Sequence, residues 1–422
     1  MLPERRATLL IKNVGQLVTL AGAVPRRGDQ MKDLGLIDNG AVAVFDQHVL
    51  AVGRLREIER QVSLAEDCVV IDAGGAVVTP GLIDAHTHPI FSMTRELEFE
   101  MRLQGTSYTE IAEAGGGIRA SVRDLRATPI AVLIEKATKR LDRMLSYGVT
   151  TIEAKSGYGL DLDSELKQLQ AIRQLNLLHV VDLVPTFLGA HEVPDEYREK
   201  RSRYMDLIVH EMIPAVAKDR LAEFSDVFCE KGVFSLDESR NIQQAALHAG
   251  LKLKFHADEL TPFGGAELAA SMKAVSADHL VYVSDAGIKA LAEAGTVAVL
   301  LPGTTFCLGG KRYAPARRII EAGVVVALST DCNPGTSYTE SLPFILTLAA
   351  LELKLTAAEA LTAATANAAC AIGREQSIGR LEKGLLADMV IWDMADYREL
   401  PYHYAVNLAR TVIKRGKVAA NN

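Results

Sequence analysis

Two histidines separated by one residue close an apolar run near the start of the chain. The run extends from Val78 to His88, and His86 and His88 are the imidazoles at its end. On a β-strand, residues i and i+2 point to the same face, so both rings can approach one point. A lone pair of this kind also occurs by chance on surface strands. As part of a metal site, it would supply half of the ligands.

Ligand-type residues also follow other apolar runs: His256, His279 and Asp331. Three imidazoles and one carboxylate suit a divalent transition metal, and an open coordination position for water would make the site catalytic. Taken alone, Asp331 could instead cap the segment that follows it. Taken together, these residues predict one metal ion bound by His86, His88, His256 and Asp331.

The chemistry expected at such a site is hydrolysis. A metal ion lowers the pKa of water that it binds from about 16 toward about 7, which provides hydroxide at neutral pH. Glu259 lies three residues after His256, and its carboxylate can take a proton from this water and pass it to a leaving nitrogen. His279 can complete the ligand set, donate a hydrogen bond to a developing oxyanion, or be an ordinary core histidine. We predict that Glu259 and His279 are the catalytic side chains.

Eight apolar runs, mostly separated by helix-length stretches, precede or contain these residues. This alternation is typical of a (β/α)8 barrel, in which functional groups stand where strands end. Between Pro129 and Gly148, apolar residues recur at helical spacing. A doubly wound sheet is the competing architecture, but no Gly-x-Gly-x-x-Gly fingerprint joins a first strand to a helix. The runs cover residues 77–88, 149–155, 181–188, 226–230, 252–256, 274–279, 296–301 and 324–330.

The two ends of the chain differ from its middle. Residues 1–75 and 381–422 contain short strands punctuated by Gly and Asp. The sequence therefore predicts an α/β protein with a TIM-like (β/α)8 barrel over residues 76–380. Both termini are expected to build one composite small β-sandwich domain.

Composition narrows the possible partners. The 422 residues are 49% apolar, with a net charge of −7 and interspersed charges. No basic stripe indicates nucleic acid or an anionic membrane, so we expect a small-molecule partner. Five scattered cysteines argue against a disulfide framework or a zinc knuckle. No stretch has the continuous apolar centre of a signal peptide or membrane span, and we expect a cytoplasmic protein.

Several motifs together resemble those of the amidohydrolase superfamily: Pro80 to His88, His256 to Glu259, Asp278 with His279, and Ser329 to Asp331. The resemblance covers nearly the whole chain and implies a metal-bearing barrel with a terminal β-domain. A second set of motifs is similar to a single branch of this superfamily. It comprises Arg95 and residues 98–103, 114–118, 155–160, 187–191, 228–232 and 331–335.

This narrower resemblance implies that the chain opens the ring of 4-imidazolone-5-propanoate to N-formimidoyl-L-glutamate in histidine degradation. Arg95 would then bind the propanoate carboxylate with its guanidinium. The alternative for Arg95 is a surface ion pair with Glu96 or Glu98, and the alternative for residues 333–336 is a plain Asn-Pro-Gly turn. The resemblance implies further substrate contacts at Tyr158, His191, Asn333, Gly335 and Thr336.

The resemblance also implies one metal ion per subunit, zinc or iron, and we expect a homodimer. A binuclear site bridged by a carbamylated Lys231 is the less favoured arrangement. Two other functions stay open. A deaminase of a purine or pyrimidine ring could use the same metal, Glu259 and His279, but would leave Arg95 without a carboxylate to bind. A non-catalytic scaffold with this fold should have lost metal ligands, and here all are present.

Overall fold

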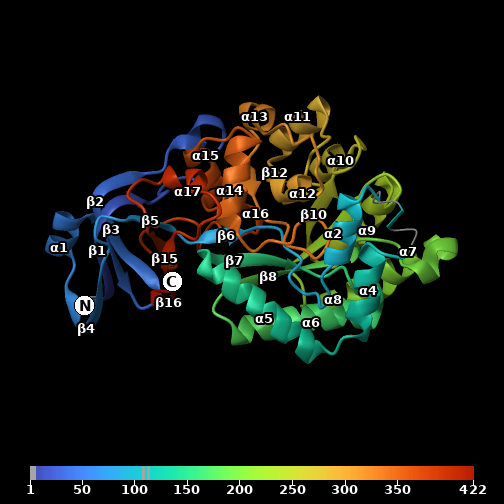
Figure 1. The fold of residues 1–422 in the computed structure, drawn as a ribbon, viewed down its shortest axis with the longest axis horizontal. Helices are drawn as coiled ribbons and strands as arrows, with labels where there is room; N and C mark the ends of the chain where they lie inside the picture. The colour runs from blue at the N-terminus through green and yellow to red at the C-terminus, as the bar shows by residue number, and fades with distance from the viewer. Residues whose placement is uncertain (1–5, 107–109, 112–114) are drawn as a thin grey trace.

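Eight parallel strands form a barrel from the middle of the chain (Figure 1). The computed structural model describes residues 6–106, 110–111 and 115–422. Each barrel strand pairs with the next one along the chain, so the predicted barrel is confirmed. The strands are β6 (Leu82–Asp84), β7 (Val149–Lys155), β8 (Asp182–Ala190), β9 (Phe224–Cys229), β10 (Lys252–Ala257), β11 (Ser276–His279), β12 (Val297–Leu300) and β13 (Val326–Leu328).

Helices alternate with these strands and bury their apolar faces. The predicted helix before Gly148 is α5 (Ile130–Ser146), which buries Leu133, Ala137, Leu141 and Met144. None of the helices in the described ranges is long and apolar enough to cross a lipid bilayer. The other main helices are α2 (Glu96–Leu103), α4 (Ile118–Ala127), α6 (Leu162–Leu178), α7 (Arg201–Leu207), α8 (Ile213–Lys218), α9 (Leu236–His248), α10 (Gly265–Ser271), α11 (Asp285–Ala294), α12 (Pro302–Cys307), α13 (Ala316–Glu321), α14 (Leu342–Leu351), α15 (Ala357–Ala363) and α16 (Ala366–Ala371).

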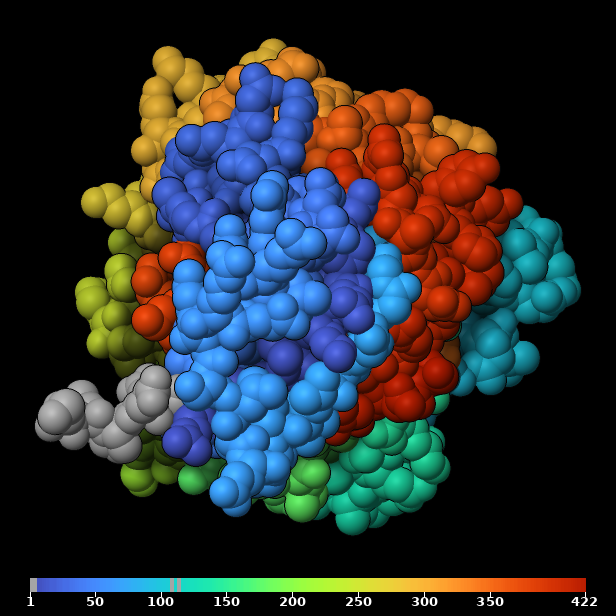
Figure 2. All heavy atoms as spheres, turned by 90° about the vertical axis from the view of Figure 1, so that its left-hand side faces the viewer, coloured from blue at the N-terminus to red at the C-terminus, as the bar shows by residue number. Residues whose placement is uncertain are grey.

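A second sheet combines both ends of the chain at one side of the barrel. Figure 2 shows N-terminal segments in blue beside C-terminal segments in red on this face. This arrangement confirms a small β-domain built from both termini, while its division at residues 75/76 and 380/381 stays a prediction. The strands are β1 (Ala7–Val18), β2 (Leu36–Phe45), β3 (His48–Arg54), β4 (Leu64–Asp72), β5 (Val77–Pro80), β14 (Met389–Trp392), β15 (Ala409–Lys414) and β16 (Lys417–Asn421).

The first predicted barrel run, residues 77–88, is wrong as a single strand. It divides at Gly81: β5 before it pairs with β1 and β14 of the small sheet, and β6 after it pairs with β7 of the barrel. Both halves are equally apolar and buried, so hydrophobic patterning could not separate them. The histidine pair follows β6 in the loop at the barrel mouth.

Candidate active site

The barrel closes between its first and last strands through a buried carboxylate. Asp84, the last residue of β6, accepts hydrogen bonds from the backbone N–H and the hydroxyl of Thr330, at 2.9 and 2.6 Å, and also from the hydroxyl of Ser329. Burial raises the pKa of Asp84 to about 6, although these hydrogen bonds oppose the rise. Among the described residues no ladder pairs β6 with β13, so these hydrogen bonds of Asp84 join the two ends of the barrel sheet.

We call this join between β6 and the segment after β13 the seam. Backbone hydrogen bonds of the residues that follow extend the seam and bring candidate ligands together. The backbone N–H of Asp331 donates to the carbonyl of His86 at 3.1 Å, and that of His88 donates to the carbonyl of Cys332 at 2.9 Å. Asp331 has a φ of 53°, which is in the left-handed region that a non-glycine residue adopts only at a cost. The seam fixes His86, His88 and Asp331 beside one another.

The distances among these three side chains suit a metal ion. The Nε2 atoms of His86 and His88 lie 3.5 and 3.4 Å from Oδ1 of Asp331. Around a tetrahedral zinc with bonds near 2.1 Å, neighbouring ligand atoms are about 3.4 Å apart. Nε2 of His86 is buried and has no hydrogen-bond partner, a state that is costly without a ligand. The donor set therefore fits a metal ion.

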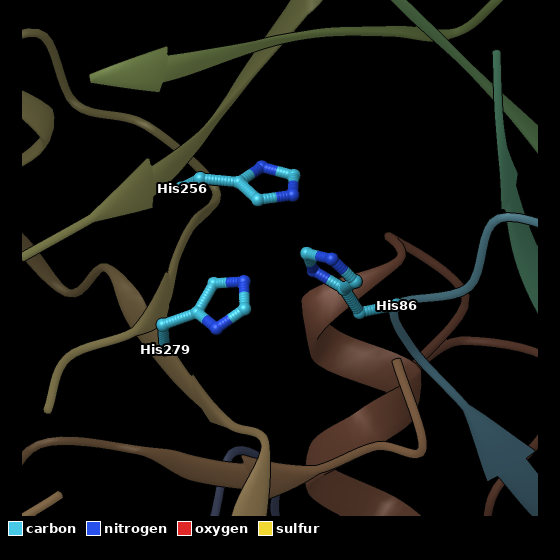
Figure 3. Close-up of side chains that lie close together, drawn as sticks. All are labelled: His86, His256 and His279. Carbon is cyan, nitrogen blue, oxygen red and sulfur yellow. The ribbon is translucent and has the colours of Figure 1, made fainter. Parts of the chain in front are cut away.

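His256 and His279 face the same point from neighbouring strands. Figure 3 shows their rings converging with that of His86, and the ring centres of His86 and His256 are 4.5 Å apart. One ligand atom from each of these three histidines lies within 4.8 Å of the others. The structure thus brings all four predicted ligands to one place, and it also brings His279 there.

Two aspartates orient the candidate ligands from behind. Oδ2 of Asp278 lies 2.6 Å from Nδ1 of His86, and Oδ2 of Asp226 lies 3.0 Å from Nδ1 of His256. A carboxylate at Nδ1 fixes the tautomer and leaves Nε2 free to bind a metal. Asp226 escaped the sequence analysis because it lies in the interior of the apolar strand β9.

Glu259 occupies the position expected of a proton carrier. It lines the same pocket, with Oε2 3.5 Å from Nε2 of His279. Burial and the negative charge of Asp331 raise the pKa of Glu259 to about 8, and burial lowers the pKa of His279 to about 3. Glu230 holds the next part of this loop by accepting the backbone N–H of Leu260 at 2.9 Å. A carboxyl group with a pKa near neutrality can both accept and release a proton.

Arg95 is buried, so the surface interpretation of this residue is wrong. Its Nε does donate to Glu98 at 2.8 Å, as the ion-pair alternative supposed, but both side chains are at most 10% exposed. Nη2 of Arg95 is buried without a hydrogen-bond partner, and Arg95 lines the pocket. A Cβ on Gly335 would overlap this guanidinium. Gly335 therefore makes room for Arg95 whether or not it also contacts substrate.

Tyr158 and His191 lie together on another wall of the pocket. Their ring centres are 5.4 Å apart, and the His191 ring stacks 5.1 Å from that of His88. Nδ1 of His191 lies 2.9 Å from the carbonyl oxygen of Gly157. Because a carbonyl can only accept, Nδ1 carries the proton and Nε2 is left as an acceptor for a substrate N–H group.

The segment after Asp331 forms the expected turn. Oδ1 of Asn333 accepts the backbone N–H groups of Gly335 and Thr336, both at 2.8 Å, and its Nδ2 donates to the carbonyl of Asp331 at 2.7 Å. The amide of Asn333 is thus used within the turn. Asn333 and Thr336 nevertheless line the pocket, so substrate contact at this turn stays a prediction.

The pocket has a volume of about 490 Å³, within the range of small-molecule sites. Sequence reasoning assigned no role to several residues of its walls, although Arg102, Ile118 and Phe228 lie in the motifs quoted for the narrower resemblance. Lys231, the candidate for a carbamylated bridge, is exposed and does not line the pocket. The missed lining residues are Arg102, Thr106, Ile118, Glu192, Phe228, Leu260 and Leu308.

Comparisons with known proteins agree with this architecture. The model of the amidohydrolase family matches residues 77–419. The chain is 51% identical to an imidazolonepropionase of Geobacillus kaustophilus, with 98% of both chains covered. It is 52% identical to an imidazolonepropionase of Symbiobacterium thermophilum, with 98% of this chain and 97% of the relative covered. A zinc-bound adenosine deaminase structure from Xanthomonas campestris matches 99% of this chain and 93% of its own, with a TM-score of 0.69 and 20% identity, which supports the fold alone.

Proposed function

Because the chain belongs to the amidohydrolase family and is so similar to imidazolonepropionases over nearly its whole length, we propose that it hydrolyses 4-imidazolone-5-propanoate. The product is N-formimidoyl-L-glutamate, and the reaction belongs to histidine degradation. The observation that carries this proposal is one pocket that holds both a cluster of metal-type ligands and the buried guanidinium of Arg95. A substrate that has both a ring to be hydrolysed and a carboxylate tail needs both the metal-type ligands and the guanidinium.

His86, His88, His256 and Asp331 would hold one metal ion, zinc or iron. When bound, it supplies an activated water and polarises the ring carbonyl. The three imidazoles and one carboxylate do not discriminate between the two metals, because both accept this ligand set. Elemental analysis of the purified protein will identify the metal and its stoichiometry.

The side chains around this position divide the remaining work. Arg95 pairs with the propanoate carboxylate, Tyr158 and His191 bind the ring, and the turn at Asn333, Gly335 and Thr336 binds substrate or product. The unprotonated Nε2 of His191 accepts a ring N–H group. Because both the tail and the ring are held, the carbonyl carbon is fixed in place for attack.

Proton transfer is the task of Glu259. Its carboxylate accepts a proton as water attacks the ring carbonyl, and then delivers that proton to the ring nitrogen as the C–N bond breaks. His279 is neutral because burial lowers its pKa to about 3, and it donates a hydrogen bond to the oxyanion that forms on the carbonyl oxygen. The ring carbonyl becomes the second carboxylate of the product.

An absorbance assay of imidazolone propanoate consumption, with and without a chelator, tests this function. Turnover that is lost with the chelator and restored by metal supports it. A rapid release of ammonia from cytosine or guanine, without turnover of imidazolone propanoate, would instead establish a deaminase. A purified protein that lacks metal and cannot be reconstituted would establish the scaffold alternative.

Two broader properties belong to the same proposal. The protein is a homodimer, which light scattering of the purified chain will test. It acts in the cytoplasm, where histidine degradation supplies its substrate, and fractionation of cells that produce it will test the location.

A further inference from the structure

Two lysines are buried completely beneath the candidate metal site. Lys155 ends β7 and Lys254 lies in β10, and both side chains are 0% exposed. A buried ammonium group is costly unless anionic partners surround it. Nζ of Lys155 lies 2.7 Å from Oδ2 of Asp226, 2.9 Å from Oε1 of Glu153 and 3.7 Å from Oδ2 of Asp278. The proposed reaction makes no use of this ammonium.

Two of these carboxylate oxygens also hold imidazoles that we assign to the metal. Oδ2 of Asp226 lies 3.0 Å from Nδ1 of His256, and Oδ2 of Asp278 lies 2.6 Å from Nδ1 of His86. The oxygens that face Lys155 are therefore the same atoms that orient the two rings. Without a cation between them, the buried carboxylates would repel each other, and the rings attached to them would move.

Burial by itself would favour neutral Lys155, but the carboxylates of Asp226, Glu153 and Asp278 raise its pKa above the ordinary value. The group is thus a fixed positive charge. It also lies between Glu153 and Asp278, two carboxylates that could hold a second cation together with His86. The ammonium takes the place of that cation.

We infer that Lys155 is a positioning residue of the metal site: its ammonium joins Asp226 to Asp278 and so fixes the rings of His256 and His86 with Nε2 toward the metal. This inference rests on the metal site proposed above. Residues behind metal ligands typically change metal affinity by about 10- to 100-fold when they are removed. Lys155 acts on two ligands at once.

Lys254 provides a matched control, because it is equally buried and lies in the same charge cluster. Its Nζ lies 3.2 Å from Oε1 of Glu153 and donates to the carbonyl of Ala85 at 3.3 Å. Within the described part of the chain, Lys254 makes no ion pair with Asp226 or Asp278. Both ammonium groups act on Asp278 through their charge, but only Lys155 lies within ion-pair distance of Asp226 and Asp278. Removal of either lysine deletes one buried charge, but only removal of Lys155 takes away the contact that joins these two carboxylates.

The test compares the full-length variants K155M and K254M after removal of metal. Co²⁺ is titrated into each protein against a competing chelator, and the visible absorption spectrum of bound Co²⁺ reports the coordination geometry. We expect K155M to lose about 10- to 100-fold in Co²⁺ affinity and to show an altered spectrum. K254M should keep the spectrum and remain within about threefold of wild-type affinity, even if both variants unfold at a lower temperature.

A wild-type Co²⁺ affinity and spectrum in K155M would overturn the inference, and so would a loss of Co²⁺ affinity in K254M equal to that in K155M. Neither result would contradict the proposed metal site itself. A wild-type protein that binds no Co²⁺ would overturn the metal site and the inference together. If K155M does not fold, K155Q is tested in its place, because it keeps a hydrogen-bond donor in the cluster. K155Q should lose Co²⁺ affinity, but by less than the roughly 100-fold upper limit expected for K155M. If neither K155M nor K155Q folds while K254M does, Lys155 is needed for folding instead, and the inference is wrong.

Discussion

The small sheet and the mouth of the barrel differ in whether their buried polar side chains have hydrogen-bond or ion-pair partners. In the small sheet, buried polar groups are paired: Nε1 of Trp392 donates to Thr79 at 2.9 Å, and Nζ of Lys414 lies 2.7 Å from Asp388. Among the described residues, no strand of this sheet carries a buried side-chain nitrogen or oxygen without a partner.

The mouth of the barrel shows the reverse. Nε2 of His86, Nε2 of His279 and Nη2 of Arg95 are each buried without a hydrogen-bond partner. Since unpaired buried polar atoms are costly, they persist where a ligand satisfies them or where function requires them. The small sheet is thus built for stability, whereas the barrel mouth keeps polar atoms ready for a metal ion and a substrate. Substitutions in the two regions should separate activity from stability.

The largest loss of activity should follow removal of a metal ligand. We expect H256A to lower kcat/KM by at least about a thousandfold, because it removes the activation of water. Elemental analysis of the purified variant should show that metal content falls with activity. Near-normal turnover by H256A with little metal would contradict the assignment.

Replacement of the proton carrier should come next. E259Q keeps the shape of the side chain but cannot accept a proton, so kcat should fall by about 10²- to 10⁴-fold while the metal content stays at the wild-type level. Steady-state kinetics on samples of measured metal content will check this result. A kcat close to that of the wild type would remove Glu259 from the mechanism.

The pH profile should also depend on Glu259. The active form is the carboxylate, so kcat/KM falls as the pH drops through its pKa. Burial and Asp331 raise this pKa to about 8, and the positive charge of a bound metal lowers it again. The acidic limb should therefore lie between the ordinary value of 4.5 and 8. A limb at or below 4.5, or the same limb in the residual activity of E259Q, would contradict this prediction.

Loss of the carboxylate partner should have a smaller effect, mainly on KM. R95A removes a charge-assisted interaction of about 1.5 to 3 kcal/mol, which corresponds to a KM about 10- to 150-fold higher. R102A is the matched comparison, because Arg102 also lines the pocket and has a buried Nη1 without a hydrogen-bond partner. A larger KM increase in R102A than in R95A would assign the tail to Arg102.

The smallest effect on activity should come from the small sheet. Ile391 is fully buried in its core, so I391A should lower the free energy of unfolding by about 2 to 5 kcal/mol. Below the unfolding transition, kcat and KM should stay near the wild-type values. A large kcat decrease in folded I391A would show that the two regions are coupled.

The sequence predicted the barrel and most of the site because strand ends carry strong local signals. The spacing of His86 and His88, and the placement of His256 and Asp331 after apolar runs, reflect the geometry of parallel strands that end at one face. The structure places these four side chains where the pattern predicted. The local sequence pattern was sufficient to predict where these four side chains lie.

Long-range contacts were the part that could not be predicted. The division at Gly81 depends on which sheet each half of an apolar run joins, and the seam at Asp84 depends on closure between distant strands. Asp226 lies inside the buried strand β9 and Lys155 ends the buried strand β7, and the roles of both follow only from neighbours that the chain brings together. A single sequence does not encode such pairings in its local pattern.

Reconstitution of the metal-free protein tests directly whether one metal ion per chain is required for hydrolysis. The rate of imidazolone propanoate consumption is measured as zinc or iron is added in fractions of an equivalent. We predict no turnover without metal and a linear rise that stops at one equivalent per chain. Full turnover by the metal-free protein, or a rise that continues to two equivalents, would contradict it.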